Sequence, residues 1–502
     1  MSASRFDLRG RSLRALAARG TLINSAFAVA VGLLGLLRGF LLAALLTPED
    51  YGVWGILLVS LGTLTWLKAV GISDRFVQQD EADQELEFQR AFTLEAILNT
   101  ALGLLVVAAV PVMAILYDES KIIAPGLALV ALLPAMTLQA PLWVLYRKMD
   151  FARQRALMAL DPIVGLAVGV GMAAAGAGYW SFVGAALAGA YVTAIAALWT
   201  CPYPLRWRYD AARARSYISF SGPLLVSSVG GIVVAQGSIL AGQAAAGLAA
   251  AGAITLASSV SFFTNRVDDV LTDTLYPAIC AVADRTELLF ESFVKSNRLA
   301  LMWALPFGFG LALFAPDLQS FGLGDDWGDA VEPLQAFGVA AAIGHLGFNW
   351  TAYFMARADT KPIAVHSVSA AAAFLAIELP LILAYGLRGV AIGTVAVVAV
   401  SLLVRWLFLR RLFTDFRLGR HALRALWPAV PGVVLVLAAR ALETGERTAL
   451  EATLELVLYG VVTVAVTVLS ERRLLREAIG YLRPQAPPAG GPAAPPATSP
   501  PA

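Results

Sequence analysis

Long apolar runs separated by short polar connections repeat along almost the whole chain. Crossing the hydrocarbon core of a bilayer takes about 20 apolar residues in a helix, and backbone groups in lipid must be hydrogen-bonded within that helix. The pattern therefore predicts an all-α, polytopic membrane protein with fourteen transmembrane helices. These lie near residues 21–46, 50–72, 91–117, 122–146, 156–175, 179–200, 217–240, 244–264, 297–315, 331–356, 363–385, 388–409, 425–441 and 449–470.

The connections between these runs are short, and none could form an extramembrane domain. The longest outside connection, 316–330, is small for a glycan polymerase or ligase, which needs a long outside loop for its catalytic residues. We therefore do not expect an enzyme. The expected parts are a basic amphipathic segment (1–20), helices 1–6 (21–200), helices 7–12 (217–409), helices 13–14 (425–470) and a cytoplasmic tail (471–502) that is Pro/Ala-rich and disordered from 484.

Composition agrees with a membrane protein. Only 14% of the residues are charged, against about 25% in soluble proteins, and the mean hydropathy is +0.72. The net charge of +2 gives no reason to expect a nucleic-acid partner. The two cysteines, Cys201 and Cys280, have no metal or redox spacing.

The placement of the basic residues predicts the orientation. If the N-terminus is inside, the outside loops carry only Lys121, Arg388, Arg440 and Arg447. Nearly all other Lys and Arg residues fall in or beside inside segments, as the positive-inside rule requires. Both termini are therefore expected in the cytoplasm.

A weak internal repeat is also present. The first two helices turn at residues 46–52, and about 200 residues later the segment 247–252 turns in the same way. Six predicted helices separate the two turns. Repeats of this kind are common in transporters that rock one half against the other.

Four strings resemble the polysaccharide transporter branch of the multidrug/oligosaccharidyl-lipid/polysaccharide exporter superfamily. They are LLAALLTPEDYGVW at 41–54, LYRKMDF at 145–151, GAGYWS at 176–181 and LYPA at 275–278. Their order and spacing match that family over about 460 residues.

This resemblance implies two pseudo-symmetric six-helix lobes plus two C-terminal helices, around a cavity open to one side at a time. The implied activity is flipping of an undecaprenyl-pyrophosphate-type oligosaccharide across the bacterial inner membrane. Partners would be this cargo, membrane lipids, and a polysaccharide polymerase and glycosyltransferases. The main alternative is a multidrug or cation antiporter of the same superfamily, although such proteins usually have twelve helices and acidic cavities.

Cationic and amide side chains inside the bundle are candidates to bind an anionic headgroup. Arg38 lies deep in the first helix, where a charge costs about 2.5–3.5 kcal/mol unless it faces water or a partner. Related lipid-linked-sugar flippases carry cavity arginines on this helix; a buried ion pair is the alternative. Asn265 and Arg266 end the eighth helix, where Arg266 could instead be a positive-inside anchor. Lys68, near the inner end of the second helix, is also explained by snorkelling.

Two acids are candidates for coupling to a proton or another cation. Asp161 precedes Pro162 at the start of the fifth helix, a pattern equally typical of an N-cap. Glu378 lies in the eleventh helix just before Pro380, where no cap explains a charge.

Several polar residues within helices complete the candidate set. Gln139, Gln236, Asn349 and His345 could line a cavity, and interhelical hydrogen bonding is the alternative. No phosphate-binding Gly-Lys-Ser/Thr loop and no His/Cys cluster is present, so neither ATP hydrolysis, nor a metal, nor another cofactor is expected.

Overall fold

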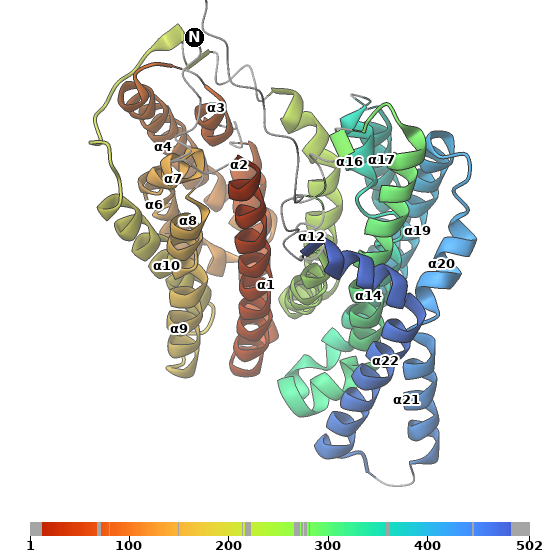
Figure 1. Ribbon diagram of the computed structural model, residues 1–502. Coiled ribbons are helices and arrows are strands. Elements are labelled where there is room, and N and C mark those ends of the chain that lie inside the picture. The colour runs from red at the N-terminus through yellow and green to blue at the C-terminus, as the bar shows by residue number, and fades with distance from the viewer. Residues whose placement is uncertain are drawn as a thin grey trace, which may run out of the picture.

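The computed structural model describes residues 13–67, 72–79, 81–148, 150–212, 214–215, 222–265, 272, 275, 279–280, 282–357, 359, 361–443 and 446–482. Within these residues the chain forms helices and no strands. Figure 1 shows the helices in two groups, with α1–α10 on the left and α12–α22 on the right. We call these groups the N-half and the C-half.

The N-half is a bundle of long helices and several short ones. Its fourth predicted span, 122–146, is interrupted by turns and runs as η1, α5, α6 and α7. The elements are α1 (Leu13–Leu45), α2 (Pro48–Leu67), α3 (Ile72–Gln78), α4 (Gln84–Leu116), η1 (Ser120–Ile122), α5 (Ile123–Leu129), α6 (Leu132–Leu138), α7 (Pro141–Arg147), α8 (Phe151–Met158), α9 (Leu160–Ala174) and α10 (Trp180–Trp199).

The C-half begins with α12, which contains two predicted spans joined at Gly247 with a φ of 85°. Its elements are α12 (Gly222–Ser261), η2 (Phe262–Thr264), α14 (Thr286–Leu318), η3 (Gln319–Leu323), η4 (Asp325–Ala330), α15 (Val331–Gly344), α16 (Trp350–Ala356), α17 (Lys361–Ala373), η5 (Phe374–Glu378), α18 (Leu379–Tyr385), α19 (Leu387–Leu412), α20 (Leu418–Leu426), α21 (Val430–Leu442) and α22 (Ala449–Leu482). The segments η3 and η5 are π-helical turns.

Helices occupy the described parts of all fourteen predicted runs. Over these residues, ten helices are long and apolar enough to cross a membrane, and eleven if α20 and α21, bent by 52°, form one span. The tenth predicted run is broken between α15 and α16, so neither piece is long enough alone. The N-terminal basic segment and the tail beyond 482 lie mostly outside the described residues.

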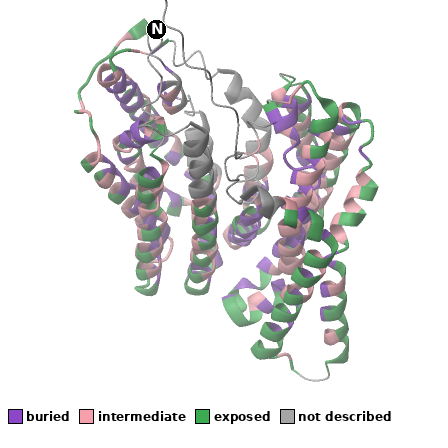
Figure 2. Ribbon diagram, in the orientation of Figure 1, coloured by how far each residue is buried: buried purple, intermediate pink, exposed green. Residues whose placement is uncertain are grey.

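The outer surface of the helices is apolar. Figure 2 shows exposed residues along the outward faces of the peripheral helices. Many of them are large and hydrophobic, including Leu104, Ile115, Trp199, Val461 and Leu469. So extensive an apolar surface would aggregate in water, and lipid is the solvent that it suits.

The turn between α1 and α2 is fixed by a capping box. The Asp50 carboxylate accepts hydrogen bonds from the backbone N–H and hydroxyl of Thr47, and Thr47 Oγ1 accepts from the backbone N–H of Asp50. The same carboxylate accepts from the backbone N–H of Tyr179 at 2.9 Å. The strings at 41–54 and 176–181 therefore meet in space, and this contact ties the start of α2 to the start of α10.

The two halves meet where α2 crosses α12, and glycines allow the close approach. A β-carbon at Gly52 would lie 2.1 Å from the carbonyl oxygen of Leu248, and one at Gly252 would lie 1.8 Å from that of Pro48. The two turns of the internal repeat thus pack on each other. Beside them, the Tyr51 ring lies edge-on to Trp327 of η4, with centroids 5.1 Å apart. This end of the molecule is closed between the halves.

We predict that Gly252→Leu forces this end open, because the added side chain has no room against the Pro48 carbonyl. Spin labels at Lys121→Cys and Asp326→Cys, both exposed at this end, would report a longer distance between the halves. The background would carry Cys201→Ser and Cys280→Ser.

The matched control is Gly35→Leu on α1, where no atom lies within 4 Å of an added β-carbon. It should leave the distance unchanged. An unchanged distance in Gly252→Leu itself would show that the glycine contact does not hold this end closed.

Candidate functional site

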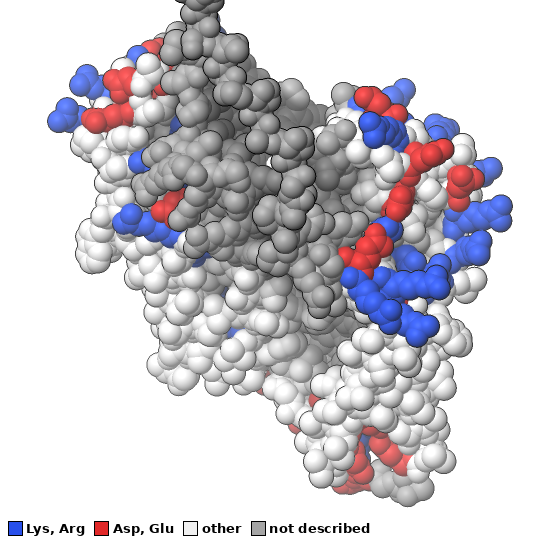
Figure 3. Space-filling view, viewed as in Figure 1, with Lys and Arg blue, Asp and Glu red and all other residues white. Residues whose placement is uncertain are grey.

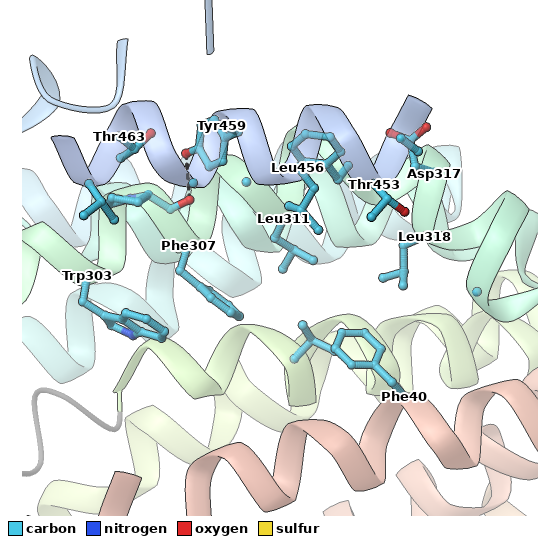
Figure 4. A pocket seen from close by; sticks show the side chains of 18 of the residues that line it. Phe40, Trp303, Phe307, Leu311, Asp317, Leu318, Thr453, Leu456, Tyr459 and Thr463 are labelled. Carbon is cyan, nitrogen blue, oxygen red and sulfur yellow. Dashed lines mark hydrogen bonds between the residues drawn. The ribbon is translucent and has the colours of Figure 1, made fainter. Parts of the chain in front are cut away.

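One cavity is an apolar groove whose lining comes mainly from the C-half, with Phe40 of the N-half on one side. It has a volume of about 830 Å³ and is lined by residues of α1, α12, α14, η3 and α22. In Figure 4, Phe40 of α1 lies across the space from Phe307 and Leu311 of α14, and Leu456 and Tyr459 of α22 form another wall. We call this cavity the groove. Its lining suits a hydrocarbon chain better than a polar molecule.

The groove depends on how closely α22 approaches α14. Gly310 makes this approach possible, since a β-carbon there would lie 3.1 Å from the Tyr459 ring. The Tyr459 hydroxyl donates a 2.8 Å hydrogen bond to the carbonyl oxygen of Pro306. Pro306 lies within α14, so the hydrogen bond joins α22 to α14. It also gives the phenolic hydroxyl, the only polar group of the tyrosine side chain, a partner.

Ion pairs hold α22 at one end of the groove. Asp317, at the end of α14, pairs with Arg440 of α21 at 2.7 Å and with Arg447 in the following loop. Glu455 of α22 pairs with the same two arginines. These four residues form the Asp317 clamp. The hydrogen bonds that Arg447 donates to Asp317 and Glu455 raise the pKa of Arg447, so it stays charged.

A second set of ion pairs holds α22 at its other end. Glu471, where the backbone of α22 departs from helical geometry, pairs with Arg298 of α14 and lies 4.0 Å from Arg424 of α20. Lys295 of α14 also pairs with Glu477. We call Arg298, Arg424 and Glu471 the Glu471 clamp. Charges are thus concentrated at the two ends of α22, and the span between them is apolar.

Sequence reasoning did not find either clamp. Arg440 and Arg447 were counted only as outside charges, and the acids that pair with them stand far away in the sequence. The local signal was the presence of Glu443 and Glu455 around Arg447. No local pattern points to Asp317.

Arg38 faces α9 rather than the groove. A β-carbon added at Gly165 of α9 would lie 3.4 Å from Nη1 of Arg38, and the guanidinium is attracted electrostatically by Asp161. Within the described part of the chain, Arg38 makes no hydrogen bond or ion pair. The residue is only half-buried, and neither the groove nor the second cavity described below includes it.

Asp161 is exposed in the first turn of α9, and its side chain packs against Gly189 of α10. The N-cap of α9 is Ala159, so the interpretation of Asp161 as an N-cap is wrong. The helix begins two residues earlier because α8 continues into it through helical geometry at Ala159. Asp161 therefore lies beside Arg38 without a capping role.

The remaining candidates lie in different places. Gln139 donates a 3.0 Å hydrogen bond to the Ala190 carbonyl and so links α6 to α10, which is the interhelical alternative. Gln236 is half-buried on α12. Lys68 and Arg266 lie outside the described residues.

Asn265, His345 and Asn349 are brought together at a second cavity of about 430 Å³. This cavity also includes Arg405 of α19, a charge inside a predicted span that sequence reasoning passed over. The rule that singled out Arg38 would have found it, because both are intramembrane arginines.

Glu378 is buried in the core of the C-half. Its side chain is 1% exposed, and Oε1 accepts hydrogen bonds from Ser238 of α12 at 2.5 Å and Thr394 of α19 at 3.1 Å. The π-helical turn η5 ends at this residue, just before Pro380. No basic residue in the described part of the chain pairs with it. A buried carboxylate held by two hydroxyls can bind a proton or a small cation.

Solved structures define the class of this fold. An inward-facing multidrug resistance transporter of the MATE family, in the MOP superfamily, has a TM-score of 0.63 at 16% identity, covering 79% of this chain and 99% of that one. The lipid II flippase MurJ, in an inward closed conformation, has a TM-score of 0.60 at 12% identity, covering 90% and 100%. An outward-facing MATE transporter has 0.54 at 17% identity, covering 81% and 97%. The chain is a multi-pass membrane protein with this transporter fold.

The sequence places the chain within one family of that class. A profile of the polysaccharide biosynthesis protein family matches residues 41–332, more than half of the chain. The protein therefore belongs to this family, which confirms the resemblance of its sequence strings. No curated protein matches the chain.

Proposed function

We propose that the protein flips a lipid-linked oligosaccharide from the cytoplasmic to the outer leaflet of the bacterial inner membrane, for polysaccharide synthesis at the cell surface. The observation that carries this proposal is the groove. It has the volume and apolar lining to hold part of a lipid tail while the headgroup crosses between the halves.

We propose that cargo enters the protein from the cytoplasm. The end with the α1–α2 turn is closed, and Figure 3 shows Lys and Arg side chains gathered toward the opposite end, where α16 and α17 lie. The positive-inside rule makes that basic end cytoplasmic. Glycosyltransferases that build the cargo would act on that side, and a polymerase would act on the other.

The alternative function is export of a drug or cation, and one of the similar structures is named a multidrug resistance transporter. The fold alone does not separate these functions. A groove lined by apolar side chains favours a lipid-linked cargo. Efflux of a fluorescent dye by cells carrying the wild-type chain would favour the alternative.

We predict that Gly460→Trp abolishes most glycan export by filling the groove. Gly460 is a lining residue of α22 with no atom within 4 Å of an added β-carbon, so the indole enters empty space without displacing the backbone. Surface polysaccharide should fall at least roughly tenfold, which corresponds to about 1.4 kcal/mol of lost binding. Cell-surface glycan per unit of membrane protein is the measurement.

The control for this variant is Gly171→Trp on α9. Gly171 is exposed, is not part of the groove, and also has free space around an added β-carbon. Export should stay near the wild-type value. Equal export by the two variants would remove the groove from the transport pathway.

We propose that Arg38 attracts the anionic headgroup as it enters. Arg38→Ala should block export, whereas Arg38→Lys keeps the charge and should retain part of it. Export is measured as surface glycan at matched protein levels. The double variant Arg38→Ala/Asp161→Ala separates the two roles, because a purely internal charge pair would be relieved by removing both members. Normal export in Arg38→Ala, or recovery in the double variant, would contradict the cargo role.

We propose that Glu378 couples transport to a proton or cation gradient. Glu378→Gln keeps the size and the hydrogen-bonding capacity but not the titratable group, so transport into inverted vesicles should fall about tenfold. The residual transport should no longer respond to ionophores. Glu332→Gln, at an exposed acid that is 3.6 Å from Arg388, is the surface control. Wild-type transport that ignores ionophores would show that Glu378 has no coupling role.

A further inference from the structure

The tenth predicted span is broken, and side chains from other helices form hydrogen bonds with the backbone groups at the break. α15 ends at Gly344 and α16 begins at Trp350, with Gly347 between them at a φ of 76°. Arg405 Nη1 donates a 2.6 Å hydrogen bond to the Gly344 carbonyl. Asn297 of α14 donates to the His345 carbonyl at 2.9 Å and accepts from the backbone N–H of Gly347 at 3.1 Å.

Such a break is tolerated at membrane depth only where it is buried in protein or lines a polar cavity. Here it does both. The cavity of about 430 Å³ lies at the break, and its lining comes from α15, the break itself, α16, α19, Thr272 and Asn265, the residue after η2. The lining residues that the argument uses are Asn265, His345, Asn349, Trp350 and Arg405. Broken helices mark binding sites in many transporters.

Asn349 is the residue that points to a ligand. Its side chain is 4% exposed, and its Nδ2 donates a 2.9 Å hydrogen bond to Ser296 Oγ. Its Oδ1 is buried and has no hydrogen-bond partner among the described residues. Leaving a buried acceptor unpaired is energetically costly, so a donor is expected to reach it.

Asn99 shows that an orphan oxygen alone is not a site. Its Oδ1 is also buried without a partner, and the residue is 2% exposed. It lies in the N-half, bonded to Thr137 of α6, and lines neither of the cavities described here. Asn349 differs because the residue lines a cavity.

The chemistry of the lining defines what fits. Asn349 offers an acceptor for a hydroxyl, Arg405 brings positive charge, and the buried Trp350 contributes an aromatic ring. Trp350 is held in place by His366, with ring centroids 5.1 Å apart, and His366 accepts from Arg405 Nε at 3.1 Å. A compact ring with several hydroxyls and a nearby negative charge satisfies all three groups.

We propose that this cavity binds a sugar ring of the cargo's headgroup, with a sugar hydroxyl donating to Oδ1 of Asn349. This inference rests on the proposed function and adds to it a headgroup subsite within the C-half. The groove takes the lipid and the cavity takes the first sugar. A ligand that lacks the hydroxyl would leave the Asn349 acceptor unpaired, and a protein that lacks the acceptor would leave the sugar hydroxyl unpaired. Such a site therefore distinguishes ligands with the hydroxyl from ligands without it.

The test is protection of an engineered thiol in the purified full-length protein in nanodiscs. Thr351→Cys, on a Cys201→Ser/Cys280→Ser background, places the thiol in the cavity wall. Its modification by N-ethylmaleimide is measured with glucose, galactose, mannose and N-acetylglucosamine, and with the 1-phosphate of each. At least one should slow modification several-fold, and its 1-phosphate should act at lower concentration because of Arg405.

Adding Asn349→Ala should weaken this protection about tenfold or more. Asn349→Asp, which keeps an acceptor of the same size but adds negative charge, should keep protection by the neutral sugar and lose the advantage of the phosphate. Asn99→Ala removes an equally buried amide outside the cavity and should leave protection unchanged. Without sugar, each variant should be modified at the same rate as the parent Thr351→Cys protein, which confirms that it is folded.

Protection by none of the eight compounds would overturn the subsite, as would equal protection of the Asn349→Ala and Asn99→Ala proteins. Failure of the subsite is distinguishable from failure of the proposed function. If Gly460→Trp blocks glycan export but no sugar protects the thiol, the flippase function stands and the cavity is wrong. If sugars protect but export is normal without this protein, the cavity stands and the function is wrong.

Discussion

A polar group that leaves water for the bilayer must find its partner inside the protein, and this constraint decides where the chain can place charges and helix breaks. The interruption between α15 and α16 exists because Arg405 and Asn297 satisfy its backbone. Glu378 remains in an apolar core because Ser238 and Thr394 donate to it. Where no such partner is available, as in the middle of the groove, the chain stays apolar.

The same constraint explains why the C-terminal helices are fastened at their ends. Ion pairs near the membrane surface lose less hydration than pairs at mid-depth, so they are the cheaper way to attach α22 to α14. The Asp317 clamp and the Glu471 clamp take these positions. Between them, contact relies on close packing at Gly310 and on one tyrosine hydrogen bond. A flexible hydrocarbon chain can enter there without breaking an ion pair.

The fold could be predicted from the sequence because its signal is local. Each apolar run of about 20 residues carries its own evidence for a helix, and the alternation of Lys and Arg tests the count. The break at 345–349 could not be predicted in this way, since Gly347 is one glycine among many in the predicted spans. The break is stabilised by the hydrogen bonds of Asn297 and Arg405 to its backbone, and these residues are about 50 and 60 residues away in the sequence.

The candidate site was predicted in part for the same reason. Glu378 was found because a carboxylate before a proline in an apolar run needs an explanation. Asn349 was named as a possible cavity residue, but its orphan oxygen depends on Ser296 occupying its amide nitrogen, which only the fold reveals. The lining of the groove is mostly apolar. Its walls come from α1, α12, α14, η3 and α22, whose sequences resemble any lipid-facing surface, so only their packing creates it.

The contact between the halves suits a protein that must open and close at this end. The ion pairs of the two clamps lie entirely within the C-half, so separation of the halves leaves none of their charges unpaired. What holds α2 against α12 is close backbone approach at Gly52 and Gly252, beside the edge-on contact of Tyr51 with Trp327. When these surfaces separate, only their dispersion contacts are lost, because lipid tails are as apolar as the surfaces that they then cover. The glycines therefore allow this end to close tightly and still to open, and a larger residue at either position would remove the closed state while leaving each half intact.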